Sequence, residues 1–282
     1  MHYYNLTKPG IIYGNTITAA AGFLFASRDS IDWLLMFYTL IGFALVTASA
    51  CVINNILDRD IDARMERTKE REIPSGRISV RHAAIFGSIL GLAGTLVLFF
   101  ATNLVALGVL LFGYCMYLIV YTLAKRRTVY FTYAGALAGA VPPVVGYTAV
   151  SGALDTSALL LYAILVFWQM AHFYAISIYR AKEYAVAGIP VLPLQKGLVR
   201  TKVEIVLFIG AFAAAFSMLV IPVAPRAGFV ILGVSLLWLL YAILGFWTAS
   251  SGRWARRMFL FSLVVIVLVS FALSLVGFNA FL

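Results

Sequence analysis

Charged residues, histidine and cysteine are scarce in this sequence. Only 11% of its 282 residues are charged, and it has three histidines and two cysteines. Cys51 and Cys115 lie in separate apolar stretches, with no CxxC pair or Cys/His cluster. Neither a disulfide framework nor covalent c-type haem attachment is therefore indicated.

Apolar residues are correspondingly abundant, at 63% of the chain, and they recur in runs of about twenty. A helix of roughly 20 apolar residues crosses a hydrocarbon core about 30 Å thick. The runs are continuous rather than alternating, which favours helices over a barrel. We predict one all-α domain, 1–282, a polytopic membrane helix bundle of nine transmembrane helices with an inner-face active-site cavity. The spans are expected near 10–28, 32–54, 83–101, 103–123, 132–150, 157–178, 203–222, 227–249 and 257–279.

The few bases are distributed unevenly between the two sides of the predicted membrane. With nine spans and a cytoplasmic N-terminus, 19 of the 21 Lys and Arg residues lie inside and the C-terminus lies outside, as the positive-inside rule requires. The net charge of +10 therefore needs no nucleic-acid partner. Topology alone accounts for most of it, and an inner-face site that attracts anions is compatible with the same pattern.

The densest charge cluster is "NNILDRDIDARMERTKERE", directly after the second span. Asn54, Asp58 and Asp62 are spaced i, i+4 and i+8, which places them on one helical face, with Asp60 roughly opposite. Neighbouring carboxylates repel, most strongly where water is scarce. A divalent cation would offset this repulsion, and Mg²⁺ commonly binds one or two carboxylates plus substrate phosphates. The alternative is an ordinary solvated helix end.

A second inner segment reads "WQMAHFYAISIYRAKEYAVAGIPVLP". His172, Tyr179 and Glu183 return to one face of a continuous helix, and Gln169 lies one turn from the histidine. A lone histidine on an apolar helix is more often a hydrogen-bonded core residue than a ligand. A polar residue inside the membrane nevertheless indicates a functional site.

In the fifth span, Pro142 and Pro143 are expected to bend or loosen the helix.

A third inner segment, "YTLAKRRT", contains three consecutive bases at the inner end of the fourth predicted span. Such bases are most often topology anchors. Together with Lys69, Arg71 and Arg77 they are also suited to a diphosphate leaving group, which needs cations around its oxygens as negative charge accumulates.

These segments together resemble a known family. The Asn-x-x-x-Asp-x-x-x-Asp run is similar to the signature of the UbiA-type intramembrane polyprenyl transferases. The blocks "LTKPGI", "DRDIDARMERT", "YTLAKRRT", "GAVPPVVGY" and the His172 segment resemble its haem-modifying branch, the haem O synthases or protohaem IX farnesyltransferases. The resemblance covers residues 6 to 194, and the last three spans match by hydropathy only.

The resemblance implies transfer of a farnesyl group from farnesyl diphosphate to a vinyl group of haem B, giving haem O, in the bacterial inner membrane. By position, Mg²⁺ would be held by Asn54, Asp58, Asp62 and Glu183. The diphosphate would be contacted by Lys8, Arg67, Arg71, Lys125 and Arg126.

The same resemblance places His172 against the haem, as an iron ligand, a propionate contact or a proton-transfer group. It also implies a downstream haem-modifying enzyme or a terminal oxidase assembly as a possible partner. The sequence departs from the family pattern at two positions: Ala171 stands where Pro is frequent, and Glu183 where Asp is usual.

Three other interpretations remain open at the level of sequence. A prenyl transferase acting on a quinone precursor or another aromatic acceptor would share every feature above except the acceptor. A transporter would carry its acids near the middle of the membrane. A structural membrane subunit is the third interpretation, and it would leave the two acidic sites unexplained.

Overall fold

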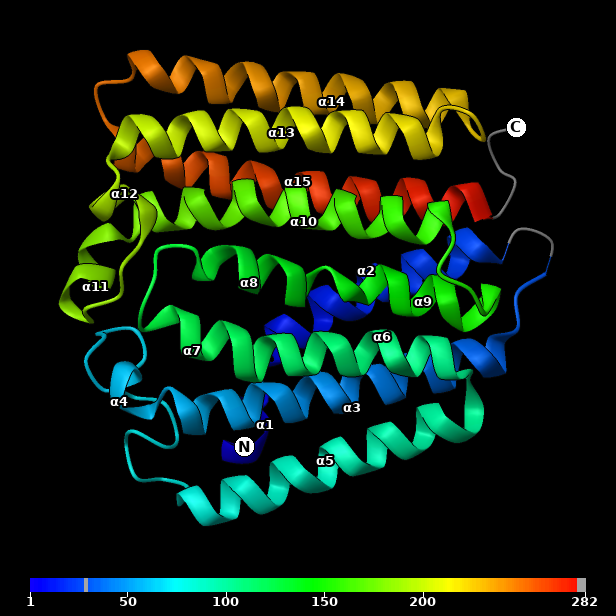
Figure 1. The fold of residues 1–282 in the computed structure, drawn as a ribbon, viewed down its shortest axis with the longest axis horizontal. Helices are drawn as coiled ribbons and strands as arrows, with labels where there is room; N and C mark the ends of the chain where they lie inside the picture. The colour runs from blue at the N-terminus through cyan, green and yellow to red at the C-terminus, as the bar shows by residue number, and fades with distance from the viewer. Residues whose placement is uncertain (28–29, 278–282) are drawn as a thin grey trace.

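The structure is a computed structural model that describes residues 1–27 and 30–277. Over these residues it contains helices and no strands, and the long helices lie side by side (Figure 1). The long helices are α2 (Pro9–Ala26), α3 (Trp33–Leu57), α5 (Val80–Ala101), α6 (Leu104–Cys115), α8 (Phe131–Gly139), α9 (Val141–Ser151), α10 (Thr156–Tyr179), α13 (Leu198–Val220), α14 (Pro225–Leu244) and α15 (Ser251–Gly277). Shorter elements are α1 (His2–Leu6), α4 (Arg59–Asp62), η1 (Met116–Tyr121), α7 (Thr122–Lys125), α11 (Ala181–Val186), α12 (Leu192–Gln195) and η2 (Gly245–Trp247).

Eight segments within the described residues are long and apolar enough to cross a membrane. They correspond to the second to ninth predicted spans, so the all-α membrane bundle is confirmed and the protein is a multi-pass integral membrane protein. The first predicted span corresponds to α2, whose 18 residues include the polar Asn15, Thr16 and Thr18. Residue 28 and residues 278 and 279, at the outer ends of the first and last predicted spans, lie outside the described residues.

Two of the predicted spans are irregular, and both irregularities lie beside the cavity described below. The fourth passes from α6 through one π-helical stretch, η1, into α7. The fifth is broken at Ala140 between α8 and α9. Pro142 and Pro143 lie in the first turn of α9, where a missing backbone N–H costs little. The expected loosening at these prolines is therefore confirmed as a one-residue interruption at Ala140, within a segment that is still long enough to form one span.

The break allows α9 to pack very closely against α2. A Cβ atom added at Gly146 would overlap the carbonyl oxygen of Ala19, and one added at Gly22 would overlap that of Pro143. Backbones can approach this closely only where neither helix carries a side chain at the crossing. The contact holds the second half of α2 against the first half of α9.

The two long inner segments meet at one end of the bundle. Figure 1 shows α4, α11 and α12 together at this end, whereas α15 finishes at the opposite end. The segment after α4 is folded rather than extended, since Met65, Thr68 and Ile73 are buried. It also anchors α1, because Asn5 Nδ2 donates to Glu72 Oε1 at 3.0 Å.

The close α2–α9 crossing leads to a stability prediction. Gly146→Ala should lower the free energy of unfolding by about 1–3 kcal/mol, because the added methyl group forces the two backbones apart. Thermal unfolding in detergent, followed by size-exclusion fluorescence, measures the effect. Gly210→Ala is the matched control, since nothing lies within 4 Å of a Cβ at that position on α13. Equal stability of the two variants would contradict the close-packing account.

Candidate functional site

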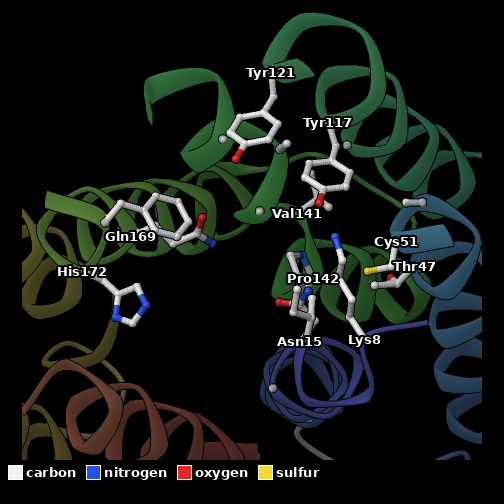
Figure 2. A pocket seen from close by; sticks show the side chains of 18 of the residues that line it. Lys8, Asn15, Thr47, Cys51, Tyr117, Tyr121, Val141, Pro142, Gln169 and His172 are labelled. Carbon is white, nitrogen blue, oxygen red and sulfur yellow. The ribbon is translucent and has the colours of Figure 1, made fainter. Parts of the chain in front are cut away.

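A cavity of about 590 Å³ lies within the bundle, lined by residues from α2, α3, α6, η1, α8, α9, α10 and α15. Lys8, Arg67 and Arg71 line it at the end where the inner segments meet. Its apolar walls include Phe43, Leu110 and Leu165. Other lining residues are Trp168, Gln169 and His172 of α10, and Tyr117 and Tyr121 of η1. Figure 2 shows both tyrosine rings and the Lys8 side chain directed into the same space.

Asn54, Asp58 and Asp62, predicted to share one helical face, form an acidic stripe that adjoins the charged end of this cavity. α3 ends at Leu57 and α4 follows at once, and the backbone bonds from Asp58 N to Asn54 O and from Asp62 N to Asp58 O keep the helical spacing through the junction. Asn54, Asp58 and Asp62 are each no more than 4% exposed. Asp60 points outward, with its side chain 49% exposed. The predicted single face is therefore confirmed.

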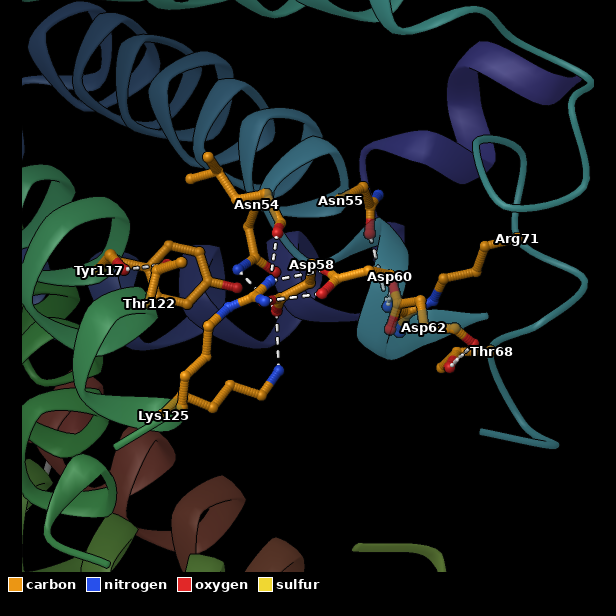
Figure 3. A network of polar contacts seen from close by, with 12 residues as sticks. Asn54, Asn55, Asp58, Asp60, Asp62, Thr68, Arg71, Tyr117, Thr122 and Lys125 are labelled. Atoms are coloured by element: carbon orange, nitrogen blue, oxygen red, sulfur yellow. Dashed lines mark hydrogen bonds and ion pairs between the residues drawn. The ribbon is translucent and has the colours of Figure 1, made fainter. Parts of the chain in front are cut away.

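A base from a different segment contacts each member of the stripe, and Figure 3 shows two of these bases, Lys125 and Arg71. Lys8 Nζ donates to Asn54 Oδ1 at 2.8 Å. Lys125 Nζ pairs with Asp58 Oδ2 at 2.8 Å, and Arg71 Nη1 pairs with Asp62 Oδ2 at 2.7 Å. Three bases thus converge on one helix end: Lys8 from the start of the chain, Arg71 from the loop that follows α4, and Lys125 from α7. Together they neutralise the two buried carboxylates.

One carboxylate oxygen in this network has no partner. Asn54 Nδ2 and Lys125 Nζ both bond to Asp58 Oδ2, whereas Asp58 Oδ1 is buried with no hydrogen-bond partner among the described residues. An ionised carboxylate oxygen only accepts, so a buried free one is costly and suits a donor or a cation. The site therefore has an open ligand position.

Lys8 reaches the stripe through an unusual backbone conformation. Its φ is +54°, in the left-handed region, and among the described residues it is the one non-glycine residue with positive φ. Pro9 follows it, which disfavours a right-handed helical conformation at Lys8. Burial lowers the pKa of Lys8 to about 8. The ammonium is therefore poorly solvated, and a nearby anion would stabilise it.

The second acidic residue lies on a different helix from the one predicted. α10 ends at Tyr179 with Arg180 as its cap, so the expectation of one continuous helical face from His172 to Glu183 is wrong. Glu183 belongs to α11, where its Oε1 accepts from Arg180 Nη1 at 2.8 Å. Its Oε2 lies 3.8 Å from Nε of Arg67, a residue that lines the cavity. Arg67 therefore connects Glu183 to the cavity.

Arg126 is not brought to the cavity. Its guanidinium forms two 2.7 Å bonds with Asp60, and Nη2 also donates to Leu57 O at 2.8 Å. This pairing lowers the pKa of Asp60 to about 2. Lys125 and Arg126 are consecutive residues at the end of α7, and their side chains therefore leave the helix in different directions. Of the two, only Lys125 contacts the stripe.

His172 is buried on α10 at the cavity wall. Its Nδ1 lies 2.7 Å from Ser262 Oγ on α15, and its ring stacks on Trp168 with centroids 4.8 Å apart. Phe259, one turn before Ser262, packs at 5.0 Å. None of these three partners was predicted from the sequence. The i−4 spacing of Trp168 from the histidine was an available signal, whereas only tertiary packing brings α15 to α10.

The donor set fits magnesium bound together with a phosphate ligand rather than a metal held by protein alone. No group of three or more His, Cys, Asp and Glu side chains converges on one point in the described part of the chain. The stripe instead offers carboxylate and amide oxygens, one of them unpartnered, beside several bases. Mg²⁺ typically takes one or two carboxylates and completes its shell with water and substrate phosphates.

Comparison with known proteins identifies the family of this fold and site. The model of the UbiA prenyltransferase family matches residues 15–276. The chain belongs to this family. It is therefore a membrane prenyltransferase, and the eight spans of the described residues and the charged end of the cavity are parts of this enzyme.

Its relatives within the family are similar over nearly their whole length. The chain is 48% identical to protoheme IX farnesyltransferase 2 of Chromobacterium violaceum over 279 residues, covering 98% of this chain and 92% of that protein. It is 45% identical to protoheme IX farnesyltransferase of Protochlamydia amoebophila over 271 residues, covering 95% and 96%.

Solved structures support the fold at lower sequence identity. A structure of digeranylgeranylglyceryl phosphate synthase superimposes with a TM-score of 0.82 at 17% identity, covering 99% of this chain and 98% of that one. A UbiA homologue from Archaeoglobus fulgidus bound to GPP and Mg²⁺ gives 0.73 at 17% identity, covering 97% and 99%.

Two consecutive bases of "YTLAKRRT" provide a test of the charge network. Lys125→Met leaves the buried Asp58 carboxylate without its cation and should destabilise the protein by about 3 kcal/mol. Arg126→Met breaks a pair whose side chains are 39% and 49% exposed, and should cost less than about 1 kcal/mol. Thermal unfolding of both variants in the same detergent gives the comparison. A larger loss for Arg126→Met would show that the network has been misassigned.

Proposed function

We propose that the protein transfers the farnesyl group of farnesyl diphosphate to a vinyl carbon of haem B, giving the hydroxyethylfarnesyl side chain of haem O. The observation that carries the proposal is a cavity with three different regions: a charged end, an apolar wall and a buried histidine. Relatives 45–48% identical over nearly the full chain and named protoheme IX farnesyltransferase support this choice of substrates.

The charged end is suited to the diphosphate. Lys8, Arg67 and Arg71 line the cavity there, and Lys125 lies on the adjoining stripe. Asn54, Asp58 and Asp62 would hold Mg²⁺, with Glu183 as the second acidic residue beyond Arg67. When bound, the ion would supply Lewis-acid polarisation of the diphosphate oxygens.

The bases change partners as the substrate arrives. Without a ligand, Lys125 and Arg71 neutralise Asp58 and Asp62 at 2.8 and 2.7 Å. A diphosphate in the cavity presents a higher negative charge, toward which both side chains can turn. Because negative charge on the leaving diphosphate grows as the allylic C–O bond breaks, these cations stabilise the transition state more than the ground state.

The prenyl chain lies along the aromatic and aliphatic walls. Tyr117 and Tyr121 stack with ring centroids 5.3 Å apart and line the cavity together with Lys8. Aromatic faces attract positive charge, so these rings stabilise the allylic cation. Phe43, Leu110 and Leu165 exclude water from it during transfer.

His172 marks the end of the cavity assigned to the acceptor. A haem vinyl group held there adds to the allylic carbon, and water then adds to the carbocation left beside the macrocycle and releases a proton, which leaves the hydroxyl group. Ala171, at the position where the family often has proline, is buried inside an uninterrupted α10. The histidine is therefore presented from a regular helix.

The location and partners form part of the same proposal. The whole chain acts as one transmembrane domain of the bacterial inner membrane, with the charged end of the cavity and the N-terminus in the cytoplasm and the C-terminus outside. Positive-inside bias supports this orientation. The product would pass to a haem-modifying enzyme or a terminal oxidase assembly.

The proposed reaction is tested with purified protein in detergent, supplied with haem B, farnesyl diphosphate and Mg²⁺, with products followed by mass spectrometry. We expect a haem product heavier by one farnesyl group and one hydroxyl group. A phenolic quinone precursor is tested in a parallel reaction. If it is prenylated while haem stays unchanged, haem is not the acceptor, and the assignment as a prenyltransferase still holds.

The acidic stripe supplies a second prediction. Asp58→Asn and Asp62→Asn should each reduce kcat by about 100-fold or more, because each removes charge that organises the diphosphate site. Asp60→Asn, two residues away and facing outward, should leave kcat within about twofold and serves as the control. Chelation of divalent cations should abolish turnover of the wild type. Wild-type turnover by an Asp58→Asn/Asp62→Asn double variant would rule out a role for the stripe in catalysis.

A further inference from the structure

Ser262 connects the cavity histidine to the backbone of α15. Its Oγ donates to the carbonyl oxygen of Phe259 at 2.6 Å, and the same Oγ lies 2.7 Å from His172 Nδ1. A hydroxyl group carries one hydrogen. Because this hydrogen is used toward Phe259, Ser262 Oγ accepts from His172, and Nδ1 must carry the ring proton.

This arrangement determines the tautomer of the imidazole. No ion pair among the described residues includes His172, so no carboxylate stabilises a charged ring, and a neutral ring that donates to Ser262 carries its one proton on Nδ1. Nε2 then presents a lone pair. Stacking on Trp168 restricts ring rotation, and Trp168 Nε1 donates to the Ser262 carbonyl at 2.8 Å, which ties α10 to α15 at the same point.

The free lone pair limits what the histidine can do. His172 lines the cavity, and Nε2 has no hydrogen-bond partner in residues 1–27 and 30–277. A nitrogen without a proton cannot donate a hydrogen bond to a propionate carboxylate. A neutral imidazole Nε2 is a common metal ligand, and ligating histidines usually donate their other N–H to an oxygen acceptor.

We propose that Ser262 is a positioning residue that holds His172 in the Nδ1–H tautomer, so that Nε2 serves as an axial ligand to the iron of the haem acceptor. This inference rests on the proposed function, because it takes haem as the substrate. The ligation would fix the macrocycle in the cavity and bring its vinyl edge to a constant position relative to the prenyl chain.

The tautomer can be measured without substrate. The chain has three histidines, and both His2 and His82 are exposed. A His2→Gln/His82→Gln protein with ring-¹⁵N histidine therefore reports His172 alone. We expect a protonated Nδ1 and an unprotonated Nε2 in this protein, retention of that state in Ser262→Thr, and its loss in Ser262→Ala. Thr keeps a hydroxyl able to bond a preceding carbonyl on a helix.

Ser270→Ala is the matched control. Ser270 lies on the same helix, is also buried, and its Oγ donates to Ile266 O at 2.8 Å. It makes no contact with His172, so its removal should leave the histidine signals unchanged. If Ser270→Ala and Ser262→Ala alter the histidine signals equally, the positioning role is overturned in favour of general packing.

Ligation itself is tested by titrating the detergent-solubilised protein with ferric haem B and recording optical and EPR spectra. Wild type, Ser262→Thr and Ser270→Ala should show nitrogen-ligated haem, and Ser262→Ala should bind haem about 10–100-fold more weakly. Haem product from the wild type without any nitrogen-ligated spectrum would overturn the ligation and leave the proposed function standing. Absence of both haem binding and haem product would overturn both.

Discussion

Two buried carboxylates set the conditions for the rest of this structure. Asp58 and Asp62 are almost fully enclosed at the end of α3, where an unpaired charge would cost several kcal/mol. Lys125 and Arg71 meet this requirement from α7 and from the loop after α4. The end of the bundle that carries α4 and α7 is therefore held together by the same charges that we assign to chemistry.

The helix packing maintains a polar site inside a protein that is otherwise adapted to lipid. Lys8 bonds to Asn54 at the charged end of the cavity, and the interruption at the buried Ala140 lies next to the cavity rather than at the lipid surface. Backbone irregularity at membrane depth is tolerated where it is buried in protein or lines a cavity. The π-helical stretch η1, which carries Tyr117 and Tyr121, is a second example, since such stretches often occur at functional sites.

Local patterns made the helices and the acidic stripe predictable from the sequence. The i, i+4, i+8 spacing survives the α3–α4 junction, and the prolines of α9 do break the fifth span. Predictions failed where tertiary contacts decide the outcome. Spacing did not show that Glu183 would lie on a separate helix from His172 or that Arg126 would bind Asp60, and no local signal linked His172 to Ser262, 90 residues away.

The central claim is that the carboxylate-bound bases are transferred to the diphosphate when substrate binds. The most direct measurement is an experimental structure of the wild-type protein with Mg²⁺ and a non-reactive thiolo analogue of farnesyl diphosphate. The account predicts that Lys125 and Arg71 leave Asp58 and Asp62 and contact phosphate oxygens, while both carboxylates face the ion. A bound analogue with the two ion pairs intact, and with its diphosphate away from the stripe, would contradict it.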